Sequence, residues 1–494
     1  SYYGARPFNI LFNKQIQSFC YYTLSLHMNL LYKVRLFLKS KFDLITNKRL
    51  KKNLLNALPF WIGAFISGSI AVLYAKLFSW AEYGTHLIFE NISWALFIIT
   101  PICFVLAWWI VQRYAPYARG SGIPQVTAAI ELSNPINSYR VNVLLSLRVI
   151  FIKILSSLIM VFGGGVIGRE GPTIQISATI FKKINDFLPA WYPKISKRNM
   201  IVTGAAAGLA AAFNTPLGGI VFAIEELTKI HFSFFKSALL TGVIIAGLTA
   251  LNFLGPYLYL GYPDLSNISS WIILLILPIA IITGVAGTGM GSAVLYISKK
   301  KNVLKTNFHK ILYVSICGLI IASLASFLDK YTLGSGKEIM VNTLFTDDKH
   351  VSWYLPILRI LGPIISFSTG AAGGIFAPSL SAGASIGAVF AEFFNVTSTE
   401  TNLLILCGMT GFLTSITRSP FTSSILVLEM TSSHNVIFYI MLTALISNLI
   451  ASSSSRHSFY DHLKDQYINE IHRTGIRKST VQAEKNGSIP DNNP

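Results

Sequence analysis

Seven long stretches of the sequence contain no Asp, Glu, Lys or Arg, and they constrain the fold more than any other feature. The chain is 52% hydrophobic and only 12% charged, a balance that soluble domains of this size rarely show. A helix needs roughly 20 apolar residues to cross the hydrocarbon core of a membrane, so most of the stretches can span it. The longest must tilt, break or contain two elements. The stretches are residues 53–75, 91–112, 199–224, 237–263, 265–298, 360–391 and 431–455.

The expected secondary structure is helical throughout. Lipid cannot hydrogen-bond to an exposed backbone, and the sequence lacks the alternating pattern of a membrane β-barrel, so we predict an all-α integral membrane protein. Glycines and other small residues recur in residues 284–291 and 362–387, which predicts helices that approach closely. The Gly-Thr-Gly-Met-Gly run at 287–291 superficially resembles a nucleotide loop. It lies in an apolar stretch with no strand before it, so we interpret it as a packing feature.

The first 53 residues carry ten Lys and Arg residues against one acid, Asp43. The positive-inside rule therefore predicts a cytoplasmic N-terminus, in the inner (plasma) membrane of a cell, and no cleaved signal peptide is expected. Residues 28–42 have basic and apolar positions at roughly helical spacing, which predicts an amphipathic helix on the inner membrane surface. A solvated disordered segment is the alternative.

Several functional classes are disfavoured by what the sequence lacks. No basic block with interleaved aromatic residues is present, which argues against nucleic-acid binding. We predict no disulfide framework, metal site or cofactor, because the four cysteines have neither CxxC spacing nor a histidine cluster nearby. An intramembrane enzyme, using Ser121 as nucleophile or the acids as metal ligands or acid/base groups, is also disfavoured. No His-Glu-x-x-His metal pattern exists, and the nine histidines have no recognisable ligand spacing around the motifs, so we expect the protein not to be an enzyme. The cysteines are Cys20, Cys103, Cys317 and Cys407.

Three pairs of motifs recur in the same order along the chain. Gly-Ser-Gly at 120–122 recurs at 334–336, and the Gly-x-x-x-Pro pattern at 168–172 recurs at 374–378. The segment from Gly204 to Pro216 and then Glu225 is matched, with identical spacings, from Gly408 to Pro420 and then Glu429. Internal duplication in a membrane protein indicates a transporter-like architecture with broken helices at the repeat interface, and inverted repeats are the expectation. The predicted parts are a basic segment at 1–53, repeats at 54–258 and 259–452, a C-terminal helix at 453–469 and a disordered polar tail at 470–494.

Three glycine-rich turns predict an anion site. They are Gly-Ser-Gly-Ile-Pro at 120–124, Gly-Arg-Glu-Gly-Pro at 168–172 and Gly-Gly-Ile-Phe-Ala-Pro at 373–378. Each places a proline near the start of an apolar segment, where a helix begins with free N–H groups and the positive end of its dipole. Ser121 adds a hydroxyl donor. A site made of such partial charges suits transport, because a directly bound Lys or Arg would hold the anion too strongly for rapid release.

Glu170, within the second turn, is the strongest single functional candidate. An intramembrane carboxylate is costly and usually marks an ion or proton pathway. Its carboxylate can take the place of an anion at the helix start and vacate it when protonated, which would couple protons to anions. The alternative is a carboxylate simply neutralised by the adjacent Arg169.

Further charged residues leave alternatives open on residue chemistry alone. Glu225 and Glu226 end an apolar segment, and they are either solvated acids paired with Lys229 or members of a proton relay. Lys153 lies in an apolar segment, where it either tunes the site electrostatically or extends to the membrane interface.

At these motifs the chain resembles the CLC family of chloride channels and chloride/proton antiporters, over about residues 54–460. The resemblance implies a CLC-type fold of two inverted repeats with broken helices, assembled as a homodimer with one anion pathway per subunit. It also implies that Ser121 and Tyr460 contact the central anion with their hydroxyls, that Ile375 and Phe376 offer backbone amides, and that Glu170 is the external gate.

The resemblance further favours one activity within the family. An acid at Glu226 is similar to proton-coupled exchangers, whereas channels commonly have an apolar residue there, and a serine at 121 resembles chloride-preferring members. We therefore predict exchange of chloride for protons across a lipid bilayer, with Glu170 and Glu226 transferring protons; a passive voltage- or pH-gated chloride channel is the alternative. Only 34 residues follow Tyr460 (494 − 460), too few for the nucleotide-binding CBS modules of many relatives.

Overall fold

The computed structural model describes residues 39–40, 42–134, 136–228, 236–255, 259–301, 303–304, 306–346 and 349–485. Most of the predicted amphipathic helix at 28–42 lies outside these residues, as does Lys229. The chain forms two compact units. The smaller is Ser1–Leu58 with Phe187–Lys194, and the larger is Pro59–Asp186 with Ile195–Pro494, which contains every predicted site residue.

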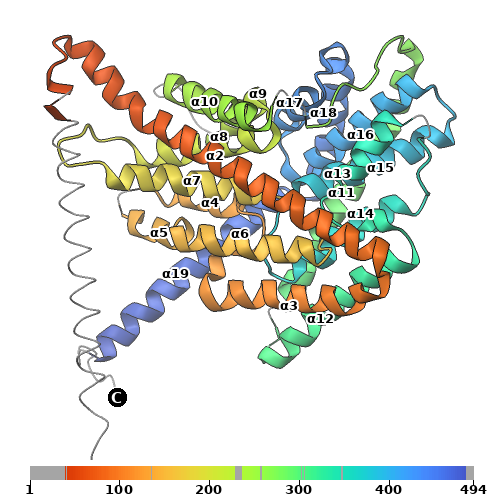
Figure 1. The fold of residues 1–494 in the computed structure, drawn as a ribbon, viewed down its shortest axis with the longest axis horizontal. Coiled ribbons are helices and arrows are strands. Elements are labelled where there is room, and N and C mark those ends of the chain that lie inside the picture. Colours follow the sequence, from red (N-terminus) through yellow and green to blue (C-terminus); the bar gives the residue numbers. More distant parts are fainter. Residues whose placement is uncertain are drawn as a thin grey trace, which may run out of the picture. The chain divides into compact units, whose positions relative to one another are not determined.

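All regular elements in the described part of the chain are helical, as predicted, with two isolated β-bridges between loops. Figure 1 shows the helices along the chain. They are α2 (Lys48–Asn91), α3 (Leu96–Tyr114), α4 (Ile123–Glu131), α5 (Val141–Leu144), α6 (Leu147–Phe162), α7 (Glu170–Phe187), α8 (Lys197–Phe213), α9 (Pro216–Phe222), α10 (Lys236–Leu254), α11 (Ile273–Lys301), α12 (Asn307–Phe327), α13 (Lys337–Phe345), α14 (Leu355–Ser368), α15 (Phe376–Phe393), α16 (Ser398–Thr417), α17 (Pro420–Thr431), α18 (Ile437–Ser454) and α19 (Phe459–Lys485).

Eight helical segments among the described residues are long and apolar enough to cross a membrane, which confirms a multi-pass integral membrane protein. One predicted apolar stretch, residues 360–391, contains two elements, because α14 ends at Ser368 and α15 begins only at Phe376. The spanning segments are Lys48–Asn91, Ser93–Tyr114, Ser138–Phe162, Ser237–Leu254, Ser270–Lys301, Asn307–Phe327, Phe376–Phe393 and His434–Ser454.

The predicted repeat is visible in two matching helix breaks. Helix α8 ends at Phe213, the next residue, Asn214, has φ of 58°, and α9 begins at Pro216. Helix α16 ends at Thr417, the next residue, Arg418, has φ of 62°, and α17 begins at Pro420. A left-handed residue ends a helix, and a proline at the first helical position suits the start of the next, so each half of the chain repeats the same break.

Small residues allow neighbouring helices to approach closely, as the glycine patterns predict. A Cβ atom on Gly383 of α15 would lie only 2.2 Å from the carbonyl oxygen of Gly408 on α16. Gly287 lies inside α11, where a Cβ atom would clash with the Ser415 hydroxyl. Within the run at 287–291, Gly287 is therefore a close-packing position, whereas a Cβ atom on Gly289 would meet nothing within 4 Å.

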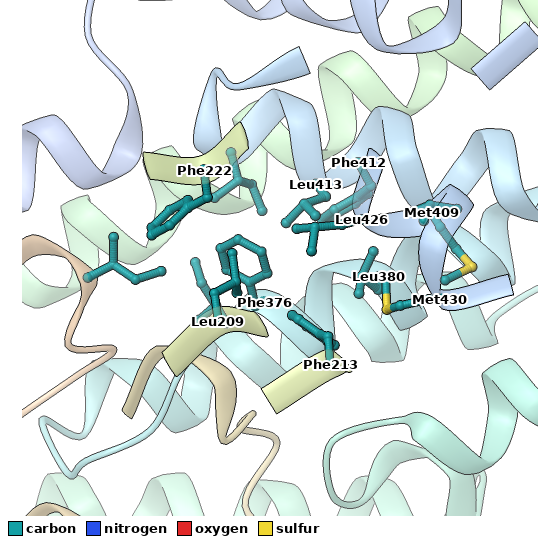
Figure 2. Packing of buried hydrophobic residues seen from close by; sticks show 14 of the residues in the cluster. Leu209, Phe213, Phe222, Phe376, Leu380, Met409, Phe412, Leu413, Leu426 and Met430 are labelled. Atoms are coloured by element: carbon teal, nitrogen blue, oxygen red, sulfur yellow. The ribbon is translucent and has the colours of Figure 1, made fainter. Parts of the chain in front are cut away.

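The main hydrophobic core surrounds the start of α15. Figure 2 shows Phe376 packed with Leu209, Phe213 and Phe222, and with side chains of α16 and α17. Because Phe376 is only 1% exposed, packing on several helices holds the first turn of α15 in place.

The C-terminal helix is longer than predicted. Helix α19 runs to Lys485, so the expectation of a disordered tail from residue 470 is wrong for residues 470–485. Leu463, Tyr467 and Ile471 are all buried, and their spacing of four places them on one face of the helix. This apolar stripe was overlooked because the segment is polar on average.

Candidate functional site

The three glycine-rich turns predicted to form a site meet in the structure. Gly120 N–H donates to the Ala371 carbonyl at 2.8 Å, and Gly373 N–H donates to the Gly120 carbonyl at 3.2 Å. Gly168 and Gly374 exchange two backbone hydrogen bonds of 2.7 and 2.8 Å. Backbone pairing thus holds the third turn between the first two.

Each turn leads into a helix, so three helix N-termini begin near this junction. Helix α4 begins at Ile123, α7 at Glu170 and α15 at Phe376. Gly122 precedes α4 with φ of 114°, a conformation that favours glycine. The first turns of the three helices provide N–H groups without intrahelical partners and a positive dipole end, which is suitable for an anion.

Several buried polar atoms near this junction have no hydrogen-bond partner among the residues that the structure describes, and three of them belong to predicted site residues. They are Ser121 Oγ, Glu170 Oε2 and the Tyr460 hydroxyl, on residues that are 1%, 1% and 2% exposed. Buried polar atoms are nearly always paired, so three orphans in one place indicate room for a polar or charged ligand. The predicted residues from the first turn, the second turn and the C-terminal helix are therefore brought together.

Tyr460 lies close to several predicted site residues. Its ring stacks on Phe376, with ring centroids 6.4 Å apart and planes inclined by 15°. Its hydroxyl lies close to the Ser121 side chain, and its charged neighbours are Glu226 and Glu170. Ile375 is the residue directly before α15, so its backbone and that of Phe376 form the start of this helix.

The Glu170 carboxyl faces the start of α15. A Cβ atom on Gly168 would lie 2.3 Å from Glu170 Oε2 and 3.2 Å from Ala377 Cβ, which shows how tightly the carboxyl fits against that helix. The Arg169 guanidinium donates to the Ala75 carbonyl at 2.9 Å and is also a charged neighbour of Glu170. Glu170 therefore lies at the junction, with its carboxyl close to the start of α15.

Glu226 is also buried, at 4% exposed, so the alternative of a fully solvated acid is wrong for this residue. It lies in a π-helical segment, Ala223–Thr228, and accepts a hydrogen bond of 2.8 Å from the Ser419 hydroxyl. Local π-helices are frequent at functional sites. A cavity of about 490 Å³ reaches Glu226, and its polar lining includes Glu131, Arg198, Asp461 and Lys464.

One lysine at this cavity keeps its positive charge. Lys464 Nζ lies 3.1 Å from a Glu131 carboxylate oxygen and 3.4 Å from Asp465. Burial lowers the pKa of Lys464, but Glu131 first, and then Asp465 and Asp461, outweigh it and raise the pKa above its ordinary value. The cavity that leads to Glu226 is therefore lined by charges of both signs.

Lys153 holds the first turn. It is fully buried, and its ammonium donates to the Gly120 carbonyl at 2.9 Å, so the alternative of a side chain extending to the membrane interface is wrong. Arg359, which sequence reasoning overlooked, has the equivalent role in the second repeat. It is fully buried and donates to the carbonyls of residues 331–334 and to the Ser381 hydroxyl.

The second Gly-Ser-Gly turn differs from the first in what fills it. Ser335 N–H donates to the Glu82 carboxylate at 2.7 Å, and a Cβ atom on Gly334 would lie 3.0 Å from the same oxygen. A carboxylate of α2 therefore already occupies the turn at 334–336. The repeat preserves the Gly-Ser-Gly turn, but at the second turn a carboxylate bonds to the N–H of the serine, Ser335.

A second cavity, of about 140 Å³, opens beside Gly120. Its lining includes the basic side chains of Arg119, Lys301 and Lys310. Arg119 is fixed by an ion pair of 2.6 Å with Glu470 of α19, and Lys301 donates to the Thr369 carbonyl. Basic residues around a recess raise the local concentration of anions.

Two repeat-related acids cap each other's helices. The Glu225 carboxylate accepts from Phe421 N–H and Thr422 N–H at the start of α17, at 3.2 and 2.7 Å. The Glu429 carboxylate accepts from Leu217 N–H and Gly218 N–H at the start of α9, at 3.1 and 2.8 Å. The matched spacing in the sequence therefore reflects a reciprocal contact between the repeats.

We expect Glu225→Ala and Glu429→Ala to destabilise the protein to a similar extent, by about 1–2 kcal/mol each, because each leaves two helix-start N–H groups without an acceptor. Thermal unfolding of the purified protein in detergent measures this. Glu90→Ala, an exposed acid near the end of α2, is the matched control. If only one of the two variants loses stability, Glu225 and Glu429 do not have equivalent roles.

Comparison with known proteins agrees with the geometry. The profile of a family described as voltage gated chloride channel matches residues 103–452. The chain is 28% identical over 444 residues to the H(+)/Cl(-) exchange transporter ClcA of Salmonella typhimurium, and to that of Salmonella arizonae, covering 86% of this chain and 90% of each relative.

Solved structures show the same fold. A slow cyanobacterial Cl-/H+ antiporter superposes with a TM-score of 0.71 at 23% identity, covering 84% of this chain and 98% of that one. A CLC-type fluoride/proton antiporter gives a TM-score of 0.69 at 20% identity, covering 83% and 98%. The two inverted repeats with broken helices are thus those of the CLC-type fold.

Proposed function

The chain belongs to the family of voltage-gated chloride channels, and from that premise we propose that it is a secondary active transporter that exchanges chloride for protons. The observation that supports this best is the group of three orphaned polar atoms, of Ser121, Glu170 and Tyr460, at the start of three helices. The relatives named as H(+)/Cl(-) exchange transporters support the same activity.

The proposed anion site lies between Ser121 and Tyr460. Their hydroxyls donate to chloride, and the amides of Ile375 and Phe376 at the start of α15 complete the shell. All donors carry partial charges, while the nearby cation, Lys153, is engaged with the Gly120 carbonyl. Such a site holds an anion without trapping it. The basic cavity beside Gly120 supplies anions to it from one side.

The proposed gate is Glu170. As a carboxylate it competes with chloride for the N–H groups at the helix starts, and once protonated it loses that attraction and swings away. Each opening of the path then involves one proton on Glu170. This alternation of proton and anion at one position is the coupling step.

The proposed proton route starts at Glu226. The polar cavity gives water access to this buried acid, and Tyr460 is an electrostatic neighbour of both Glu226 and Glu170. Protons therefore have a path to the gate that is separate from the basic cavity beside Gly120. Because the proton route through the polar cavity and the anion route through the basic cavity are separate, chloride does not pass along the proton route.

We further propose that the protein is a homodimer in a plasma-type membrane with a cytoplasmic N-terminus. Leu217 and Phe421, at the starts of α9 and α17, are 54% and 50% exposed. They lie beside the capping carboxylates of Glu429 and Glu225. Lipid disfavours such charged groups, so a second copy of the chain is the better cover for this face.

The anion specificity is expected to depend on Ser121. We predict that Ser121→Pro weakens chloride binding by roughly tenfold, because the variant loses one hydrogen-bond donor to a charged ligand. The family resemblance associates serine at this position with chloride preference and proline with nitrate preference, so the preference should move from chloride towards nitrate. Calorimetric titration with each anion measures this, with Ser133→Ala, a hydroxyl at the end of α4 that donates to the Ile130 carbonyl, as the control. Unchanged chloride affinity in Ser121→Pro would remove Ser121 from the site.

The proposed activity is tested in sealed liposomes that contain the purified protein. A chloride gradient should drive protons uphill through an exchanger, whereas a passive channel would move chloride alone. Because the two activities differ in proton movement, measuring chloride flux by itself does not distinguish them.

A further inference from the structure

Tyr259 lies in the segment that joins the two repeats, between α10, which ends at Leu254, and α11. It is only 3% exposed. The next residue is fixed by a hydrogen bond of 3.2 Å from Leu260 N–H to the Met430 carbonyl of α17. The connection between the repeats thus places the Tyr259 side chain in the protein interior. A phenylalanine would fill the same space, so the hydroxyl is not needed for packing.

The Tyr259 hydroxyl points at the gate. It donates to Glu170 Oε1 at 3.5 Å, near the outer limit for a hydrogen bond. The other carboxyl oxygen, Oε2, has no hydrogen-bond partner among the described residues. Tyr259 is therefore a side-chain donor to the carboxyl that the proposed function makes mobile.

Two contacts hold the ring in this orientation. The Phe213 ring meets it edge to face, with centroids 5.0 Å apart and planes at 78°. The Lys337 ammonium, from the first turn of α13, lies 4.7 Å from the ring centroid. Because Phe213 also packs on Phe376, the tyrosine is supported by the same aromatic group as the start of α15.

We propose that Tyr259 is a positioning residue that holds the Glu170 carboxylate in the anion path; this rests on the proposed role of Glu170 as the gate. A phenol donates more strongly to an ionised carboxylate than to a neutral acid. The contact therefore stabilises the closed, ionised gate and is weakened when Glu170 takes up a proton. Tyr259 sets the pH at which the path opens without itself touching the anion.

Other charged and titratable groups also face Glu170. They are Arg169 beside it, Glu82 and Tyr74 of α2, and Tyr460 of α19, while Lys337 acts through the Tyr259 ring. Tyr259→Phe leaves all of these in place and keeps the ring contacts with Phe213 and Lys337. Only the hydroxyl is removed, so any change in the pH dependence of chloride flux is attributable to its hydrogen bond with Glu170.

The expected effect is a shift in the pH dependence of chloride flux. Wild-type flux should rise as pH falls, because protonation releases the gate. Loss of the Tyr259 hydroxyl removes a hydrogen bond that stabilises the ionised Glu170 carboxylate. Glu170 should then be protonated, and the path should open, at a higher pH. A hydrogen bond to a charged group corresponds to a midpoint shift of about one pH unit upwards.

The test measures chloride efflux from liposomes against pH for wild type, Tyr259→Phe, Glu170→Gln and the double variant. Tyr192→Phe, which removes a hydroxyl bonded to the Leu55 carbonyl, is the matched control and should follow wild type. We expect an upward shift in Tyr259→Phe, flat profiles in both Glu170 variants, and no further change when the two substitutions are combined.

The outcomes separate the two proposals. A Glu170→Gln profile that still depends on pH as in wild type overturns the gate itself. A flat Glu170→Gln profile together with an unshifted Tyr259→Phe profile overturns the role of Tyr259 and leaves the gate intact. If Tyr259→Phe changes chloride efflux equally in wild type and in Glu170→Gln, the proposed role of Tyr259 is also overturned. If Tyr259→Phe does not fold, a ring-fluorinated tyrosine at position 259, a stronger donor, should shift the midpoint downwards, and an unshifted midpoint overturns the proposal.

Discussion

Glu170→Gln is expected to abolish proton movement while chloride still crosses the membrane, at a rate that no longer depends on pH. Glutamine has nearly the same shape as the protonated carboxyl but cannot ionise, so the path stays in the state that protonation produces. The buried position of Glu170 and the close fit of its Oε2 against the start of α15 make this the largest expected effect of any single substitution.

The measurement is paired flux, with chloride and protons recorded on the same liposomes over a range of pH. Glu82→Gln is a demanding control, because Glu82 is a nearby acid whose carboxylate is bonded to Ser335 N–H rather than placed at the junction. Coupling should survive in that variant. Proton transport that persists in Glu170→Gln would rule out Glu170 as the group that alternates with chloride.

Glu226→Gln is expected to reduce chloride-driven proton movement by roughly a hundredfold or more, since a positioned acid or base typically contributes two to four orders of magnitude to proton transfer. Chloride flux should remain, and it should still depend on pH because Glu170 is intact. This combination differs from that of Glu170→Gln, in which the pH dependence is lost as well.

The neighbouring acid offers a matched control. Glu225→Gln changes the preceding residue on the same π-helical segment, but the Glu225 carboxylate caps α17 and does not reach the polar cavity. Coupling should therefore persist in Glu225→Gln. Equal loss of proton movement in both variants would mean that the segment is simply distorted, and it would contradict a specific role for Glu226.

The residues of the site were predictable where their signal was local. Glycine and proline mark the helix starts at Ile123, Glu170 and Phe376 regardless of what surrounds them, and the structure brings these starts together. Tyr460 came only from the resemblance to a family, because one tyrosine in a polar segment has no distinctive pattern. The full length of α19 was missed for a related reason, since its apolar stripe is narrow.

The supporting contacts could not be predicted because they join distant parts of the chain. Lys153 reaches a carbonyl of the first turn, Arg359 reaches the carbonyls before α13, and Glu225 and Glu429 cap helices of the opposite repeat. Tyr259 in the linker is of the same kind. In each case the sequence shows a residue of suitable chemistry, but only the tertiary fold supplies its partner.

The most direct test of chloride/proton exchange is proton flux into sealed liposomes driven by a chloride gradient alone, with the membrane voltage set independently so that passive leakage cannot imitate coupling. Protein-free liposomes and Glu226→Gln are measured alongside. We predict uphill proton movement in wild type that is absent from both controls. Chloride flux without any proton movement in wild type would contradict exchange and would make this protein a passive channel.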